Sequence, residues 1–337
     1  STHTQVIAAV SQCEFSALGC FMQCKRTKHK LAANVPLTLH HEGRQVRTPR
    51  DLPLLTDDTR KNVDLLRARF DSLLQSTTVT CGDAIPQLHD KNLLKSTAGG
   101  HGTVEIVLAL ADGVSKRYKE VAIKTHFNDS PRKEAECLTF SSLSHENMAH
   151  YLGMDEEGKL LMEVAQGAPL SSYSASSPQS QYQLFAEEAL YVIEKVLRAL
   201  EYMHQNGLVH GDVKPLNVHY ERDDALVTLL DFSSAAVIGG VGKIRGTEGF
   251  VDTRPLINGP QPRCDVYSVG KTLLWLLTGR TSERALESLF KYCPRRAASA
   301  IQDFITKCLS TDDAVALLDA STCLAHPVFS IRGTRRD

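Results

Sequence analysis

The sequence lacks three features that define large classes of proteins. Its nine cysteines among 337 residues include no Cys-x-x-Cys pair, so neither a disulfide framework nor a structural zinc site is expected. No apolar run approaches the roughly 18 residues that cross a bilayer, and the first residues lack the profile of a signal peptide. The net charge of −1 gives no bulk attraction to nucleic acid or to anionic membranes. We therefore expect a cytoplasmic or nuclear protein with no membrane span and no nucleic-acid partner.

What is present fits a soluble globular chain, with 42% hydrophobic and 23% charged residues. A chain of this length can bury a two-lobed domain and still carry an extension. Apolar residues at helical spacing follow Asp57 and Asp58, which predicts an amphipathic helix over residues 57–75. We assign residues 1–92 to an N-terminal extension that contains this helix and offers a surface to a regulatory protein partner.

The order of the remaining elements predicts an α+β protein with two lobes of different character. Residues 93–165 form a small β-rich lobe with one helix near residues 131–143. Residues 166–337 form a larger lobe that is mostly helical and contains a long buried helix from Phe185 to Met203. Strands are expected in three parts of the small lobe, at residues 93–110, 121–124 and 149–164.

A dense group of polar residues follows the long helix. The run His-Gly-Asp-Val-Lys-Pro-Leu-Asn begins at residue 210, and Leu-Leu-Asp-Phe-Ser begins at residue 229. Asp212 can accept a proton from an attacking hydroxyl, and Lys214 can neutralise a phosphoryl group in transfer. Asn217 and Asp231 offer hard oxygen ligands to Mg²⁺. Few chemistries other than phosphoryl transfer need this combination.

The small lobe carries the groups that are expected to hold a nucleotide. Three glycines stand between two predicted strands, where backbone N–H groups can approach a triphosphate: Gly99, Gly100 and Gly102. A Gly-rich hairpin alone is more often only a turn. A strand Val-Ala-Ile-Lys about twenty residues later favours the phosphate-binding interpretation and makes Lys124 a phosphate ligand.

A buried lysine needs a carboxylate partner. Glu136 on the predicted helix is the preferred partner of Lys124, and Glu134 is the alternative. Because the two glutamates are two residues apart, they point to different faces of the helix, and only one can face the lysine.

Together these motifs resemble the eukaryotic-type protein kinase family over residues 93–330. The resemblance extends to Met162-Glu163-Val164-Ala165, which looks like the hinge that binds adenine, and to further runs that begin at Gly246, Asp265 and His326. It implies ATP and Mg²⁺ as cofactors. The implied nucleotide-binding residues are Gly99, Gly100, Gly102, Val104, Ala122, Lys124, Met162, Glu163 and Ala165. The implied metal ligands are Asn217 and Asp231, and the implied catalytic residues are Asp212, Lys214, Lys124 and Glu136.

Two details resemble the serine/threonine branch of the family rather than the tyrosine branch. These are the lysine two places after Asp212 and the pair Gly246-Thr247. The resemblance therefore implies a protein substrate with a Ser or Thr acceptor. The wording of the motifs is most similar to the MAP kinase kinase kinases and the NF-κB-inducing kinase.

Several positions depart from the family pattern. Thr97 occupies the place of the first loop glycine, and Ser233 replaces the glycine after Asp-Phe. Gly211 replaces the arginine that pairs with an activation-loop phosphate, so activity is expected to be independent of phosphorylation there. Arg254 stands where the family has the glutamate of Ala-Pro-Glu, and about Leu317 stands where its arginine partner usually lies. Both ends of that buried ion pair are therefore expected to be missing.

Two other functions are compatible with these residues. A pseudokinase that binds nucleotide without turnover, acting as a scaffold or allosteric partner, would account for Thr97, Ser233 and Arg254. A small-molecule kinase resembling the aminoglycoside phosphotransferases would share His-Gly-Asp followed by Asn217. The leading hypothesis is an active serine/threonine protein kinase, because every group expected to touch phosphate or metal is present.

Overall fold

The chain divides into two units. The first comprises Ser1–Ser144 and Ala149–Val164, and the second comprises His145–Met148 and Ala165–Asp337. The computed structural model describes residues 68, 92–98, 102–110, 118–127, 136, 139–140, 143–154, 158–173, 184–240, 246–254, 259–291, 293, 295–312 and 314–330. Of the helix predicted over residues 57–75, only Ala68 is among them, and it is helical and exposed.

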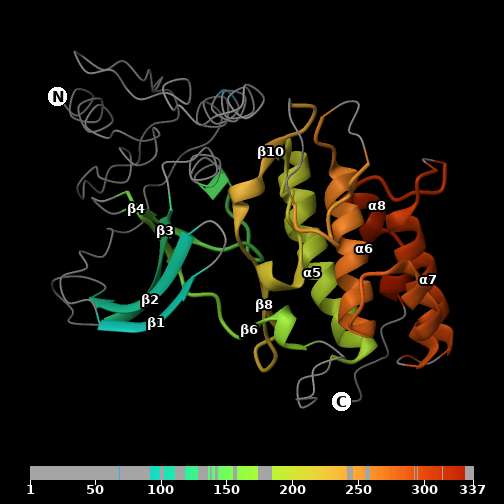
Figure 1. Ribbon diagram of the computed structural model, residues 1–337, viewed down its shortest axis with the longest axis horizontal. Helices are drawn as coiled ribbons and strands as arrows, with labels where there is room; N and C mark the ends of the chain where they lie inside the picture. Colours follow the sequence, from blue (N-terminus) through green and yellow to red (C-terminus); the bar gives the residue numbers. More distant parts are fainter. Residues whose placement is uncertain are drawn as a thin grey trace. The chain divides into compact units, whose positions relative to one another are not determined.

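The described part of the first unit contains an antiparallel sheet of five strands in the order β1-β2-β3-β5-β4 (Figure 1). The strands are β1 (Asn92–Ala98), β2 (Gly102–Leu110), β3 (Tyr118–His126), β4 (Tyr151–Met154) and β5 (Leu160–Glu163). All three strand regions expected from the sequence are therefore present.

Strand periodicity separates two faces of this sheet. Val121 and Ile123 of β3 pack with Val107 and Leu161 in a buried apolar cluster. Because side chains alternate along a strand, the intervening positions of β3 face the other side, and Lys124 is one of them. A helical segment contains Glu136, Thr139 and Phe140, all buried, and Phe140 stacks on Tyr151 of β4 with ring centroids 5.6 Å apart.

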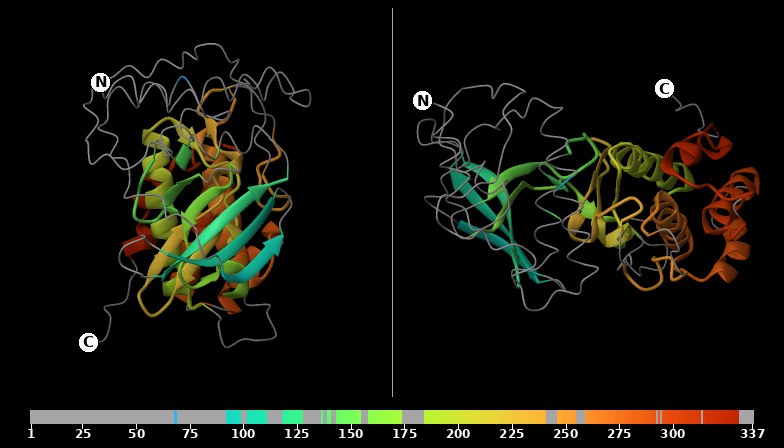
Figure 2. Two further views of the ribbon diagram at one scale, coloured as in Figure 1. Left: turned by 90° about the vertical axis from the view of Figure 1, so that its left-hand side faces the viewer. Right: turned by 90° about the horizontal axis from the view of Figure 1, so that it is seen from above.

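The second unit is mostly helical. Its helices are α5 (Ala186–Gln205), α6 (Pro262–Thr278), α7 (Arg295–Leu309) and α8 (Ala320–Leu324), and α6 contacts both α5 and α7 (Figure 2). The long helix predicted from Phe185 to Met203 is confirmed as α5. Helix α6 begins at Pro262, whose missing N–H is tolerated in the first turn. It is capped after Thr278 by Gly279, which has a φ of 70°.

Two small antiparallel sheets complete the second unit. One has the order β6-β8-β9, with β6 (Ala168–Pro169), β8 (Val218–Glu221) and β9 (Leu226–Leu229). The other pairs β7 (Leu208–Val209) with β10 (Ala236–Val237). The polar motif predicted from residue 210 onward runs between β7 and β8. Short sheets on both sides therefore fix the ends of that motif.

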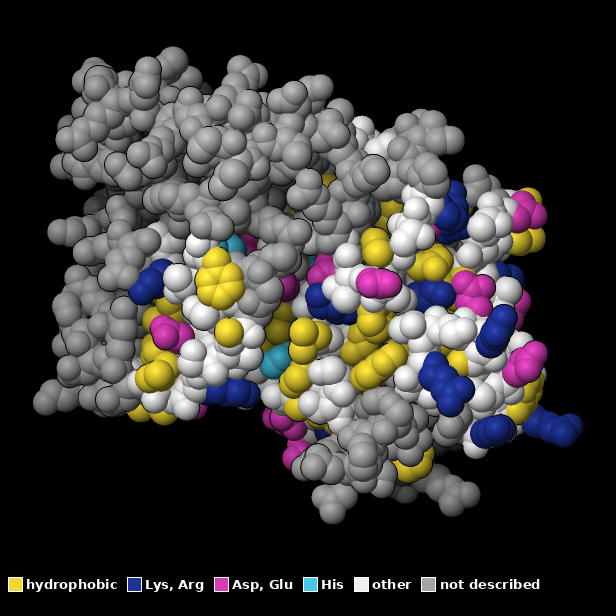
Figure 3. All heavy atoms as spheres, viewed as in Figure 1, with side chains coloured by type: hydrophobic (Ala, Val, Ile, Leu, Met, Phe, Trp, Pro, Cys, Tyr) yellow, Lys and Arg dark blue, Asp and Glu magenta, His cyan; other side chains and the backbone are white. Residues whose placement is uncertain are grey.

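Figure 3 draws one face of the described surface. Basic and acidic side chains are interspersed over the second unit there, without a broad area of one sign. Among the described residues, no helix is both long enough and apolar enough to cross a bilayer.

Candidate active site

The first unit contains a buried ion pair. Lys124 Nζ donates to Glu136 Oε1 at 2.8 Å and lies 2.7 Å from Oε2. Lys124 is 7% exposed and Glu136 is fully buried, so their charges are poorly screened and depend on each other. The structure thus pairs Lys124 with the glutamate preferred from the sequence. The alternative, Glu134, lies outside the described residues.

The neighbours of Lys124 in the sheet are residues that the sequence assigns to nucleotide binding. Val104 of β2 pairs with Lys124, and Ala122 pairs with Met162 of β5. Met162 is buried, Glu163 ends β5, and Ala165 is the first residue of the second unit's longer segment. The residues of the first unit that the sequence assigns to the adenine side are therefore close in the sheet to Lys124.

The glycine-rich turn is described only in part. Gly99 and Gly100 lie outside the described residues. Gly102 begins β2, and a Cβ there would lie 2.3 Å from the carbonyl oxygen of Thr125. A side chain is therefore excluded at this position, which explains this glycine by close backbone approach. Thr97 pairs with Val104 in the β1–β2 ladder and is exposed.

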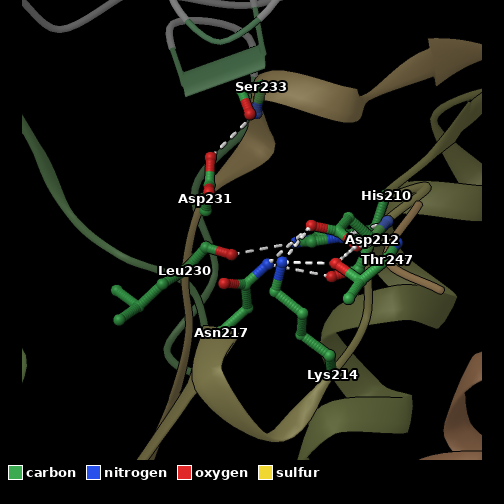
Figure 4. Close-up of polar contacts among 8 residues, drawn as sticks. All are labelled: His210, Asp212, Lys214, Asn217, Leu230, Asp231, Ser233 and Thr247. Atoms are coloured by element: carbon green, nitrogen blue, oxygen red, sulfur yellow. Dashed lines mark hydrogen bonds and ion pairs between the residues drawn. The ribbon is translucent and has the colours of Figure 1, made fainter. Parts of the chain in front are cut away.

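The second unit contains a cluster of three polar side chains, Asp212, Lys214 and Thr247 (Figure 4). Lys214 Nζ donates to Asp212 Oδ2 at 2.7 Å and to Thr247 Oγ1 at 2.6 Å. Thr247 donates to Asp212 Oδ1 through both its hydroxyl and its backbone N–H, each at 2.8 Å. The carboxylate is therefore held in one orientation with a cation beside it.

Asn217 lies next to this cluster, whereas the carboxylate of Asp231 is directed toward Ser233 (Figure 4). Asn217 Nδ2 donates to the Asp212 carbonyl at 2.9 Å, so its Oδ1 faces away from that bond. Asp231 has a left-handed backbone with φ of 63°, and its carboxylate accepts from Ser233 N at 3.4 Å (Figure 4). A carboxylate and an amide oxygen are donors that Mg²⁺ accepts while it keeps waters and phosphate oxygens. The residues present therefore fit a magnesium site.

One buried carboxylate to which the sequence assigned no role, that of Asp265, holds the backbone just before Asp212. Asp265 of α6 accepts from the backbone N–H of His210 and of Gly211, each at 2.8 Å, and from His204 Nε2 at 3.0 Å. Burial alone would raise the pKa of Asp265, but the hydrogen bond and charge of His204, the charge of His210 and the Gly211 N–H together lower it. The carboxylate therefore stays ionised and fixes the backbone that leads into Asp212.

His210 itself is fully buried and links the two polar motifs. Its Nε2 donates to the carbonyl of Leu230 at 3.0 Å. Its ring packs edge-on against the Phe232 ring, with ring centroids 5.2 Å apart. Gly211 has φ of 80°, a conformation that L side chains rarely adopt. A glycine at this position therefore leaves the segment without strain.

Arg254, where the family's buried ion pair was expected to be missing, makes other contacts in the structure. Arg254 Nε donates to Asp252 Oδ1 at 2.6 Å, and Nη1 donates to the Ser310 carbonyl at 3.1 Å, just beyond the end of α7. The hydrogen bond to Asp252 raises the pKa of Arg254, and the guanidinium also lies over the Tyr267 ring. A cation is favourable at a helix C-terminus. The segment is therefore anchored by Arg254 in a different way, and Leu317 N donates to Lys307 O instead.

The family model for the protein kinase domain matches residues 98–329. The chain belongs to the protein kinase family. The serine/threonine-protein kinase PksC of Streptomyces coelicolor is 32% identical over 209 residues, which cover 56% of this chain and 37% of that protein. The mitogen-activated protein kinase kinase kinase 2 of Arabidopsis thaliana is 25% identical over 261 residues, which cover 68% of this chain and 39% of that protein.

These relatives confirm the predicted resemblance to eukaryotic-type serine/threonine kinases, MAP kinase kinase kinases among them. The kinase chain spans less than half the length of either relative. Among solved structures, the kinase PK-1 of Cydia pomonella granulovirus has a TM-score of 0.56 at 18% identity, covering 72% of this chain and 96% of that one. The predicted α+β protein kinase fold is thereby confirmed.

Two contacts of this kinase domain lie outside the sequence-based prediction. Thr247 is 35 residues from Asp212 in the chain, and His126 Nε2 lies 3.0 Å from Glu136 Oε2. For His126 a signal was available, because a residue two places after Lys124 on a strand shares its face. For Thr247 only its place in the family motif was a signal.

Proposed function

We propose that this chain is a Mg-ATP-dependent serine/threonine protein kinase. The observation that carries the proposal is the cluster of Asp212, Lys214 and Thr247, in which a fixed carboxylate stands beside an ammonium group. In this role Asp212 orients the acceptor hydroxyl and accepts its proton, and Lys214 neutralises charge on the phosphoryl group in transfer. Kinship with protein kinases supports a protein rather than a small-molecule acceptor.

Nucleotide binding is assigned to residues of the first unit and of the hinge. Lys124, oriented by Glu136, would contact the phosphates, while Val104, Ala122 and Met162 would line the adenine side. Backbone groups at Glu163 and Ala165 would bind the adenine edge. The glycine positions Gly99, Gly100 and Gly102 would admit the triphosphate to the backbone.

Magnesium binding is assigned to Asn217 and Asp231. When bound, the ion would neutralise phosphate charge during transfer. The protein's own part is to present the two oxygen donors, and the hydrogen bond from Asn217 Nδ2 to the Asp212 carbonyl holds one of them in place.

We further propose that phosphorylation of the activation segment is not needed for activity. Gly211 offers no guanidinium to a phosphate. The backbone before Asp212 is already fixed by Asp265, and the Asp212 carboxylate is held by Thr247. The catalytic carboxylate is therefore oriented by groups of the unmodified chain.

The test is transfer of labelled phosphate from γ-labelled ATP with magnesium, to the chain itself and to a generic basic protein. Asp212→Asn keeps the side-chain shape but cannot accept the proton, so transfer should fall by about 10²–10⁴-fold, the range for loss of general base catalysis. Asp303→Asn, at a half-exposed aspartate on α7, is the matched control and should transfer as the parent chain does. Saturable ATP binding without transfer by the parent chain would refute the proposal and favour the pseudokinase alternative.

A further inference from the structure

A histidine shares the buried carboxylate of Glu136 with Lys124. His126 Nε2 lies 3.0 Å from Glu136 Oε2, while Lys124 Nζ donates to Oε1 at 2.8 Å. We propose that His126 is a positioning residue, which holds Glu136 against β3 and thereby keeps Lys124 oriented toward the nucleotide. The inference rests on the proposed function and extends it to the control of the same site.

The sheet register explains why His126 reaches this carboxylate. It is two residues beyond Lys124 on β3, so both side chains leave the strand on one face. In the β2–β3 ladder, Lys124 pairs with Val104 and His126 pairs with Gly102. The face that carries the lysine therefore also carries the imidazole, beside the glycine that ends the phosphate-binding turn.

Burial makes the contact effective. The side chains of His126 and Glu136 are 2% and 1% exposed. A hydrogen bond to a carboxylate in such surroundings is stronger than in water, and a carboxylate that lost it would regain no compensation from solvent. Glu136 is therefore held by two groups of β3 rather than one.

The two groups hold the carboxylate differently. A lysine has four rotatable side-chain bonds, so its ammonium can follow a carboxylate that moves. An imidazole is attached to the backbone through two torsions and reaches only a narrow region. The lysine therefore supplies charge, whereas His126 fixes the distance between β3 and the helical segment that contains Glu136, Thr139 and Phe140.

The unpaired ring nitrogen defines the kind of contact. His126 Nδ1 is buried and has no hydrogen-bond partner among the described residues. A proton on Nδ1 would be a buried donor without an acceptor, which is costly. The arrangement fits an imidazole with its proton on Nε2, donating to Glu136 Oε2. The contact is then a directed hydrogen bond. The side-chain amide of a glutamine at position 126 can donate a hydrogen bond to Glu136 in its place.

The experiment compares His126→Gln, which keeps a donor, with His126→Leu, which does not, in the full chain. His126→Leu should lower kcat/KM for ATP by about tenfold, as expected for loss of one hydrogen bond to a charged group, and His126→Gln should restore most of it. The matched control is His326→Leu. The His326 side chain is likewise buried, at 5% exposed, and its Nε2 lies 2.9 Å from the carboxylate of Asp303 in the second unit. It should lower stability without changing kcat/KM for ATP.

Amide hydrogen exchange gives a readout that does not need phosphate transfer. The peptide that contains Glu136, Thr139 and Phe140 should exchange faster in His126→Leu and unchanged in His326→Leu. In a Glu136→Gln background, His126→Leu should add little, because the two residues act through one contact. Unchanged exchange and unchanged kcat/KM in His126→Leu would overturn the inference, as would a folded His126→Gln as impaired as His126→Leu. A parent chain without transfer whose exchange still responds to His126→Leu would refute the proposed function while supporting the contact.

Discussion

Replacing Asp265 by asparagine should lower the stability of the second unit and loosen the backbone that leads into Asp212. The carboxylate accepts three N–H groups, two on Oδ2 from His210 and His204 and one on Oδ1 from Gly211. An asparagine retains one oxygen and turns an NH₂ group toward whatever the other oxygen had bound. With the shared oxygen retained, the Gly211 N–H becomes a buried donor that faces another donor.

The cost can be worked from these contacts. An unsatisfied buried donor costs about 1–3 kcal/mol, and two bonds that change from charged to neutral lose about 1 kcal/mol each. Relief of the burial penalty on the charge offsets part of this, which leaves about 2–4 kcal/mol. For a domain of this size we expect Tm to fall by about 5–15 °C, since each kcal/mol shifts Tm by about 2–4 °C.

Thermal unfolding measured by calorimetry or circular dichroism checks the stability, and phosphate transfer below the unfolding range checks the activity. Transfer should fall in Asp265→Asn even where the protein is folded, because the backbone before Asp212 loses its anchor. Asp303→Asn is the control, at a carboxylate that is 53% exposed and for which a small change is expected. Equal unfolding temperatures for the two variants would refute the reasoning.

Two more outcomes follow from the charged groups of the second unit. Arg254→Ala leaves the buried carboxylate of Asp252 without its cation, so it should lower stability by about 1–3 kcal/mol and raise KM for a protein substrate. Lys307→Ala is the control, because its partner Asp303 is already exposed to water. An equal loss of stability in both variants would contradict this reasoning. The pKa of Asp265 is lowered below its ordinary 3.8, so its ionised form stabilises the fold above that pH, and this contribution is lost as pH falls through the lower folded value. When the free energy of unfolding is measured against pH, it should fall less steeply below pH 3.8 in Asp265→Asn than in the parent chain. Curves that coincide below pH 3.8 would exclude the contribution.

The sequence predicted those parts of the site that depend on local geometry. Asp212, Lys214 and Asn217 are within six residues, so a single loop conformation brings them together. The pair of Lys124 and Glu136 was the preferred pairing because a buried lysine needs a carboxylate, while periodicity alone left Glu134 as the alternative.

Contacts between distant segments were harder to predict. Arg254 reaches the Ser310 carbonyl across 56 residues, and Asp265 reaches His210 across 55. Both depend on where α6 and α7 pack, which the pattern of apolar residues does not specify. The loss of the family's glutamate was visible in the sequence, but the substitute was not, because a backbone carbonyl at a helix end carries no residue signature.

Three carboxylates of this kinase are oriented by different sets of donors, and the differences bear on regulation. Glu136 has an ammonium and an imidazole, Asp212 has an ammonium and the Thr247 donors, and Asp265 has two backbone N–H groups and a histidine. None of these donors is a phosphate-dependent arginine. Since each carboxylate is oriented by groups present in the unmodified chain, these contacts support the proposal that activity does not need a phosphate on the activation segment. We therefore expect control of this kinase to act on the helical segment of Glu136, which Lys124 and His126 hold against β3.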